Sequence, residues 1–175
     1  MTVSIFGKVH RKVPVPFREV IAGFNACILK ATGLKCKRSC GQECADFAQS
    51  CDNAGAIVTF CGLVRNSDDK TLSAMMIEHY PGMTERALTR IATEAQNRWS
   101  LHNCLIIHRY GQLAPGAQIM MVATAARHRS DAFCAADFLM DYLKSRAPFW
   151  KKEISMSGAE WVAAKDTDEA ALLRW

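Results

Sequence analysis

The sequence predicts an α+β fold in which helices pack against a largely antiparallel sheet. Two observations support this prediction. Between residues 54 and 153 the apolar patterns follow the order strand, strand, helix, strand, strand, helix, strand, and neighbouring strand patterns are separated by turn signals. The chain has 175 residues, half of them apolar and 22% charged, which suits one domain with a sizeable core, alone or with an appendage.

The first two strands are expected between residues 54 and 80. The segment AGAIVTFCGLV is rich in β-branched residues, and LSAMMIEHY follows after the polar segment Asn66 to Lys70. This arrangement predicts a β-hairpin. Arg65 directly follows the first strand, where it is either an exposed turn arginine or a ligand-facing one.

A helix and two more strands are expected next. Residues 83–99 carry apolar side chains at helical spacing, which predicts a helix. Two strand-like runs follow, Cys104 to His108 and Gln118 to Ala125, on either side of the turn signal Ala-Pro-Gly at residues 114–116.

The last helix is expected to begin at Ser130 or Asp131, either of which is a suitable N-cap. Pro148 ends it, because a proline removes a backbone donor and disfavours the α conformation in the residue before it. Residues 149–153 then leave as an extended segment. The helical spacing predicts that one stripe faces the core: Phe133, Ala136, Met140 and Leu143.

Basic residues mark both ends of this helix. His128 and Arg129 precede its N-terminus, where free backbone N–H groups and the helix dipole favour an anion such as phosphate. Lys144 lies in the last turn and Lys151 lies just beyond the proline. A straight helix would hold Arg129 and Lys144 about 22 Å apart. If both ends belong to one active site, a second copy of the chain must complete it, as twofold symmetry allows.

The N-terminal part of the chain is basic. Residues 1–38 hold eight Lys or Arg against one Glu, so the other 137 residues sum to −2 of the net +5. Phe17, Val20, Ile21, Phe24 and Ile28 follow a helical stripe. We expect residues 1–34 to form an extension of unknown role, and no aromatic interleaving or known module supports nucleic-acid binding there.

The cysteines favour a cytoplasmic protein. There are eight, but no convincing signal peptide accompanies them, so we expect free thiols in a reducing compartment. Cys36, Cys40 and Cys44 would share a helix face, yet no CxxC pair or fourth ligand is nearby, and a metal site is not expected. No apolar run is long enough to span a bilayer.

Several motifs carry a resemblance to a known family. In order and spacing, residues 35–175 resemble the large, catalytic subunit of molybdopterin synthase. The motifs that match are VTFCGLVRN, EHYPGMTERAL, IHRYGQLAPG, ARHRSDAF, MDYLKSRAPFWKKE and the terminal GAEWVAAKDTDEAALLRW.

This resemblance implies an α/β hammerhead fold with an additional small β subdomain over residues 35–175. It also implies a homodimer of large subunits within a heterotetramer that includes two small ubiquitin-like subunits. The C-terminal thiocarboxylate of a small subunit passes sulfur to cyclic pyranopterin monophosphate, and two transfers form the molybdopterin dithiolene. The implied large subunit holds no metal and no cofactor of its own, and neither nucleic acid nor membrane is a partner.

The family's site residues can be placed on this sequence. The resemblance implies that Lys144 and Lys151 are catalytic. The implied substrate-binding positions are Leu63, Val64, Arg65, His128, Arg129, Lys144, Lys151, Lys152 and Glu153. Cationic side chains suit this chemistry, because the pterin phosphate and the thiocarboxylate are both anions. A lysine ammonium can also stabilise negative charge that develops on oxygen, or shuttle protons if neighbouring cations lower its pKa.

Two alternatives belong to other functional classes. In the first, Cys61 or Cys134 carries a persulfide; the simpler interpretation is that both are small core residues, as free cysteines usually are. In the second, the chain is a non-catalytic binding module for a ubiquitin-like partner or nucleic acid. Substitution of the two cysteines tests the persulfide function, and substitution of Lys144 or Lys151 tests whether the chain is catalytic at all.

Overall fold

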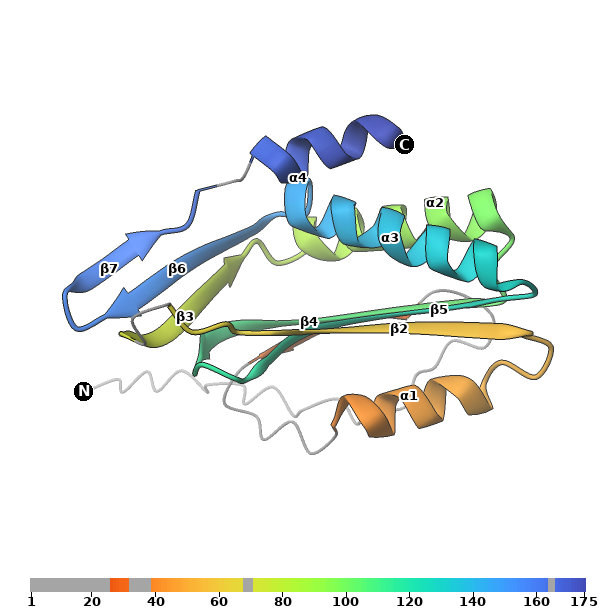
Figure 1. Ribbon diagram of the computed structural model, residues 1–175, viewed down its shortest axis with the longest axis horizontal. Coiled ribbons are helices and arrows are strands. Elements are labelled where there is room, and N and C mark those ends of the chain that lie inside the picture. Colours follow the sequence, from red (N-terminus) through yellow and green to blue (C-terminus); the bar gives the residue numbers. More distant parts are fainter. Residues whose placement is uncertain (1–25, 32–38, 68–70, 164–165) are drawn as a thin grey trace, which may run out of the picture.

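The computed structural model describes residues 26–31, 39–67, 71–163 and 166–175. They form one seven-stranded sheet flanked by helices, in the strand order β2-β5-β4-β3-β6-β7, with β1 also paired to β4 (Figure 1). The strands are β1 (Ala26–Ala31), β2 (Ala56–Leu63), β3 (Leu72–His79), β4 (Asn103–Leu113), β5 (Gln118–Ala126), β6 (Phe149–Ser155) and β7 (Gly158–Trp161). The helices are α1 (Cys40–Gln49), α2 (Met83–Trp99), α3 (Arg129–Ser145), α4 (Asp166–Ala171) and the short 3₁₀ helix η1 (Leu172–Arg174).

The sheet separates two layers of helices. Helices α2 and α3 lie on one face and α1 lies on the other (Figure 1). All strand pairs are antiparallel except the parallel pair β1–β4, which confirms the predicted α+β class. The larger core lies under α2 and α3, and its fully buried members include Leu88, Ile91, Ile106, Val122, Phe138 and Leu139.

Strand β4 joins the main sheet to a smaller one. Its residues 103–108 pair with β5, and its last three residues, 111–113, pair with β3. Strand β3 then pairs with β6, and β6 pairs with β7. This extension has its own small core of Val64, Leu72, Ile77, Leu113 and Ile119. The extension carries Lys151 on β6, beyond the end of α3.

The predicted hairpin between β2 and β3 is wrong. Strand β2 pairs with β5, whereas β3 pairs with β4 and β6. After β2, the Ser67 hydroxyl accepts hydrogen bonds from the N–H groups of Thr71 and Leu72 at 2.9 and 3.1 Å. The two strands therefore belong to different parts of the sheet although they are neighbours in sequence.

Helix α3 begins earlier than expected, and its buried stripe differs from the predicted one at Phe133. Its N-cap is His128 rather than Ser130 or Asp131, and no side-chain hydrogen bond caps it. Phe133 is 63% exposed, whereas Ala136 and Leu143 are buried as predicted and Met140 is partly buried. The buried face is built around Ala132, Ala135 and Leu139, and a residue next to Ala132 points about 100° away from it.

The N-terminal expectations are only partly within the described residues. Ile28, expected in a helical stripe, lies in strand β1, which pairs in parallel with residues 105–110 of β4. The remaining stripe residues, 17–24, and Cys36 lie outside the described part of the chain. None of the helices in the described ranges is long and apolar enough to cross a membrane.

Candidate functional site

Helix α3 holds two groups of cationic side chains apart. It runs unbroken for 17 residues from Arg129 to Ser145, with His128 as its N-cap. His128, Arg129 and Lys144 are all exposed. At 1.5 Å per residue, the backbone positions of Arg129 and Lys144 are about 22 Å apart, as the sequence predicted. No single small molecule can contact both ends of one α3.

The turn before α3 is fixed by close backbone packing. A Cβ atom at Gly55 would lie 2.3 Å from the carbonyl oxygen of Arg127, so only glycine fits there. The Thr124 hydroxyl on β5 donates a hydrogen bond of 2.8 Å to the carbonyl of Ala132 in the first turns of α3. These contacts hold the helix N-terminus, with its free N–H groups, at one end of the main sheet.

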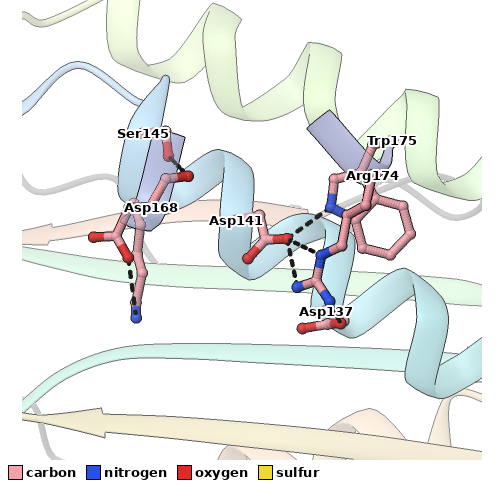
Figure 2. Close-up of polar contacts among 7 residues, drawn as sticks. Asp137, Asp141, Ser145, Asp168, Arg174 and Trp175 are labelled. Atoms are coloured by element: carbon pink, nitrogen blue, oxygen red, sulfur yellow. Dashed lines mark hydrogen bonds and ion pairs between the residues drawn. The ribbon is translucent and has the colours of Figure 1, made fainter. Parts of the chain in front are cut away.

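The other end of α3 contacts the C-terminal segment. The Lys144 ammonium lies 3.9 Å from a carboxylate oxygen of Asp168, and Arg146 lies 3.0 Å from Glu169. The Ser145 hydroxyl donates a hydrogen bond of 2.8 Å to the backbone carbonyl of Asp168, and Figure 2 shows the two residues side by side. Lys144 is half exposed, so it remains accessible beside this acidic segment.

Lys151 lies on β6, opposite Ile77 of β3, and is partly buried. Because side chains alternate along a strand, Lys151 shares a face with Phe149. The Phe149 ring stacks on His108 of β4, with centroids 3.8 Å apart and planes 14° from parallel. Lys151 and Lys144 thus flank the short turn at residues 146–148, where α3 gives way to β6.

His108 is a buried histidine that the sequence analysis did not single out. Its pKa is lowered from 6.5 to about 4, chiefly by burial; the hydrogen bond to the Arg109 carbonyl opposes the shift, and the charges of Lys151 and His79 contribute to it. His108 is therefore neutral at pH 7. His108 ends an apolar strand pattern, so it was read as part of the core. A histidine at the end of such a strand was the signal that could have identified it.

The positions after β2 are anchored to the β4–β5 turn. The Val64 N–H donates to the Ala117 carbonyl at 2.9 Å, and the Gly116 N–H donates to the Val64 carbonyl at 2.8 Å. Leu63 is 58% exposed and Arg65 is exposed, whereas the Val64 side chain is buried in the small core. Leu63 and Arg65 can therefore present side chains to a ligand, and Val64 supports them.

The side chains of Lys152 and Glu153 point to opposite faces of β6. Lys152 points to the face opposite Lys151, where its ammonium lies 5.1 Å from the ring centroid of Trp161 on β7. Glu153 is exposed and shares the face of Lys151. Neighbouring positions on this strand thus serve different faces of the small sheet.

The cysteines differ from the simpler expectation. Cys61 and Cys134 are both free and exposed, so the interpretation of them as core residues is wrong. Cys40 and Cys44 lie on α1, one turn apart as predicted, and Cys44 contacts the Thr59 hydroxyl at 3.3 Å. Within the described ranges, no group of three His, Cys, Asp or Glu side chains is arranged to hold a metal ion.

Known proteins resemble this chain over most of its length. The family model described as MoaE protein matches residues 37–146. A protein of Cereibacter sphaeroides named molybdopterin synthase catalytic subunit is 64% identical over 135 residues, which cover 77% of this chain and 92% of that protein. The protein of the same name from Escherichia coli K12 is 49% identical, covering 78% and 91% of the two chains.

Solved structures agree with the sequence relatives. Molybdopterin cofactor biosynthesis protein E from Burkholderia multivorans superimposes with a TM-score of 0.72 at 43% identity, over 87% of this chain and 97% of that one. Molybdopterin synthase from Staphylococcus aureus gives a TM-score of 0.60 at 31% identity, over 64% and 82%. The family model spans Arg65, His128 and all of α3, and together these matches show that the chain belongs to the MoaE family.

Proposed function

We propose that this chain is the catalytic subunit of molybdopterin synthase, a sulfur-transferring enzyme. It would take sulfur from the C-terminal thiocarboxylate of a small ubiquitin-like subunit and pass it to cyclic pyranopterin monophosphate, forming the molybdopterin dithiolene. The observation that carries the proposal is the cationic arrangement on α3 and β6, in a chain 64% identical to a protein named as this subunit.

The charges of the site suit the proposed substrates. The pterin phosphate and the thiocarboxylate are both anions, which repel each other unless cations lie between them. His128 and Arg129 stand at a helix N-terminus, which favours phosphate. Arg65 adds an exposed guanidinium that can bind an anion through two hydrogen bonds. We therefore assign the phosphate to these groups.

The length of α3 supports a site shared between two copies. Lys144 and Arg129 of one chain are about 22 Å apart, so a phosphate held by Arg129 cannot reach Lys144 of the same chain. In a twofold dimer, the N-terminal end of one α3 can meet the C-terminal end of the other. We propose a homodimer that binds two small subunits, with each site completed by both copies.

The two lysines would act on the reacting groups. Once sulfur is bonded to the pterin, water adds to the acyl carbon, the C–S bond breaks, and the small subunit leaves as a carboxylate; the addition builds negative charge on the carbonyl oxygen, which a fixed ammonium stabilises. We assign this role to Lys151, whose backbone is held in the sheet, and we place Lys144 toward the pterin. The ion pair of Lys144 with Asp168 is long and half exposed, so an arriving anion can displace it at little cost.

The decisive experiment mixes the purified chain with a thiocarboxylated small subunit and the pterin precursor, and measures dithiolene product. Lys151→Ala and Lys144→Ala should each lower the rate by about 10²- to 10⁴-fold, the range for electrostatic and proton-transfer groups. Arg90→Ala, an exposed cation on α2, should leave the rate unchanged. Assembly with the small subunit but no conversion would instead indicate a binding module.

Mixed dimers test the shared site. A Lys151→Ala chain and an Arg129→Ala chain, each inactive alone, should regain activity when they are mixed, because one site of the heterodimer would then be intact. If the mixture stays as inactive as the two variants alone, although mixed dimers have formed, each site takes both cations from one chain and the shared-site proposal is wrong.

A persulfide carrier is the second candidate, and the exposure of Cys61 and Cys134 favours it. Under the lysine mechanism, Cys61→Ser and Cys134→Ser should retain sulfur transfer. Loss of transfer in either variant, with the fold intact, would assign the sulfur to a cysteine. In either case we place the protein in the cytoplasm, where free thiols persist.

A further inference from the structure

One side of α3 is exposed although it carries large apolar side chains. At about 100° per residue, four of its residues point within about 60° of one another. We call them the outer flank of α3: Arg129, Phe133, Met140 and Lys144. Phe133 is 63% exposed, Met140 is only partly buried, and both cations are exposed. The outer flank thus combines the two separated cations with apolar surface that its own chain leaves uncovered.

The spacing along the outer flank is symmetric. Phe133 follows Arg129 by four residues, and Met140 precedes Lys144 by four. When two copies of α3 lie antiparallel, the register that sets Arg129 of one copy opposite Lys144 of the other also sets Phe133 opposite Met140. The twofold axis of this arrangement passes between residues 136 and 137. A single arrangement therefore joins the separated cations and covers the exposed ring of Phe133.

Strand β2 adds a second uncovered surface beside this helix. It is the first strand in the order of the sheet, and among the described strands it pairs only with β5. The backbone groups along its outer edge can therefore pair with another strand. Phe60 on β2 is 40% exposed and shares a face with Val58, which packs against the core under α3. The outer edge of β2 thus lies next to exposed apolar surface on the side of the sheet that carries α3.

The dimensions of β2 and α3 fit the same twofold axis. Both begin at the close contact between Gly55 and Arg127, and α3 lies along β2 (Figure 1). The eight residues of β2 and the 17 residues of α3 each span about 26 Å, so their midpoints are level. Helix α3 packs on both β2 and β5, about one strand spacing from an axis at the outer edge of β2. The two copies of α3 would then lie about 10 Å apart, as packed helices usually do.

We propose that the outer flank of α3 and the outer edge of β2 form the interface with a second copy of this chain. The two β2 strands pair antiparallel across the axis, and the two α3 helices pack antiparallel on the same face of the joined sheet. This inference rests on the shared site that we propose for sulfur transfer, and it names the surface that assembles that site. Arg65 follows β2 at the end of the sheet where Lys144 lies, and the second copy brings its Arg129 to that end.

The charges along the interface fit a site for anions. Cations meet cations at both ends of the paired helices, so they repel each other until an anion lies between them. The contact of Phe133 with Met140 near the centre must therefore hold the two copies together. Asp137 lies beside the axis, where its carboxylate is already paired with Arg174 at 2.9 Å. The apolar pair is consequently the best place to test the interface.

The strength of self-association tests the surface. In analytical ultracentrifugation the purified wild-type chain should be a dimer. Phe133→Asp puts a charge against an apolar partner and should raise the dimer dissociation constant by about 100-fold or more. The ring is exposed within one chain, so the variant should keep its circular dichroism spectrum and melting temperature. Leu173→Asp is the matched control, because Leu173 is 89% exposed on η1, outside this surface, and its substitution should leave the constant unchanged.

Disulfide cross-linking tests the register. The variants are made in a chain whose exposed thiols are removed by Cys61→Ser and Cys134→Ser, and this parent is the control. Phe133→Cys chains mixed with Met140→Cys chains should form a disulfide-linked dimer, because the two positions lie opposite each other. Phe133→Cys alone should not, since its two copies would be about 10 Å apart along the helices, too far for a disulfide.

The outcomes distinguish this inference from the proposed function. A monomeric wild-type chain, or a dimer that Phe133→Asp leaves as stable as before, would overturn the interface even if the chain makes product. Cross-linking of Phe133→Cys to itself, in place of the mixed pair, would overturn the register. A wild-type chain that dimerises in this way but makes no dithiolene would overturn the proposed function alone. In Phe133→Asp, dithiolene formation per chain should fall and then recover as the protein concentration rises, because the dimer forms again.

Discussion

The cationic side chains of the site differ in how firmly the structure holds them. Lys144 is half exposed and its nearest carboxylate oxygen, on Asp168, is 3.9 Å away. Lys151 is partly buried on a paired strand, beside the stacked rings of His108 and Phe149. Long exposed lysines lose rotamer freedom when they bind, whereas a lysine held in a sheet has less to lose. This difference supports a role for Lys144 in positioning the substrate and a role for Lys151 in the chemical step.

The buried histidine should make stability depend on pH. The pKa of His108 falls from 6.5 in the unfolded chain to about 4 in the folded one, so the unfolded state binds more protons between these values. Its contribution to stability is fully present above about pH 6.5, is lost as the pH falls, and is gone below about pH 4. The loss should reach about 3 kcal/mol.

Urea denaturation at pH 7 and pH 5, for the wild type and His108→Gln, measures this contribution. The variant has no titrating group at this position, so its stability should change less between the two pH values. Equal pH dependence in the two proteins would show that His108 is not the group responsible.

Some individual residues could be predicted from the sequence and others could not. The helix-end positions of Arg129 and Lys144 follow from local spacing and from Pro148, and the structure confirms them. Phe133 was wrongly expected in the core, because the spacing fits several stripes and only packing against the sheet selects one. The roles assigned to the site residues stay predictions until the variants are measured.

At the scale of elements, the turn that leads into α3 depends on one close contact between two backbone segments. The chain before β2 passes so near the β5–α3 turn that a Cβ at Gly55 would meet the Arg127 carbonyl at 2.3 Å. Gly55→Ala must therefore push the turn away from the sheet. We expect a loss of stability of about 1 to 3 kcal/mol, as for other overpacked sites, and weaker binding of the pterin phosphate by His128 and Arg129.

Thermal or urea denaturation together with a binding titration checks this prediction. Gly41→Ala is the matched control, because a Cβ there meets only the Ser39 hydroxyl at an ordinary 3.6 Å and lies within α1. Alanine in a helix should be neutral or slightly stabilising. If both variants behave alike, the turn before α3 is not held by this contact.

Elements defined by local patterns were predicted more accurately than their pairing. Helix α2 has the predicted bounds, residues 83–99, and β4 and β5 pair across the predicted turn. The pairing of β2 with β5 and of β3 with β6 joins segments more than 50 residues apart, which no local signal reports. Strand β1 pairs with a similarly distant segment, residues 105–110 of β4, and it contains Ile28, which was expected in a helical stripe.

At the scale of the whole molecule, side-chain contacts hold the C-terminal segment, residues 166–175, against α3. One carboxylate oxygen of Asp141 accepts hydrogen bonds from the side chains of both Arg174 and Trp175, at 2.7 to 3.0 Å (Figure 2). The Trp175 ring packs edge-on against Trp99 and Phe138. The same segment places Asp168 3.9 Å from the Lys144 ammonium, so the contacts at Asp141 also determine which carboxylate lies beside Lys144.

Asp141→Asn should release this segment. The asparagine side chain is neutral, so it lacks the negative charge that the donors of Arg174 and Trp175 share in the wild type. Residues 166–175 should therefore exchange their backbone amide hydrogens about tenfold faster or more. Hydrogen exchange measured by mass spectrometry would show the change. Asp137→Asn removes only one exposed ion pair to Arg174 and should leave the exchange nearly unchanged. Equal exchange in wild type and Asp141→Asn would contradict this role of Asp141.

The unbroken course of α3 has a consequence for how this family can vary. Inserting or deleting one residue within the helix would turn everything after that point by about 100° and shift it by about 1.5 Å. Lys144 would then face away from its present neighbours while Arg129 stayed in place. Related chains that keep the activity should therefore vary in their loops and at their ends, and conserve the number of residues between these two cations.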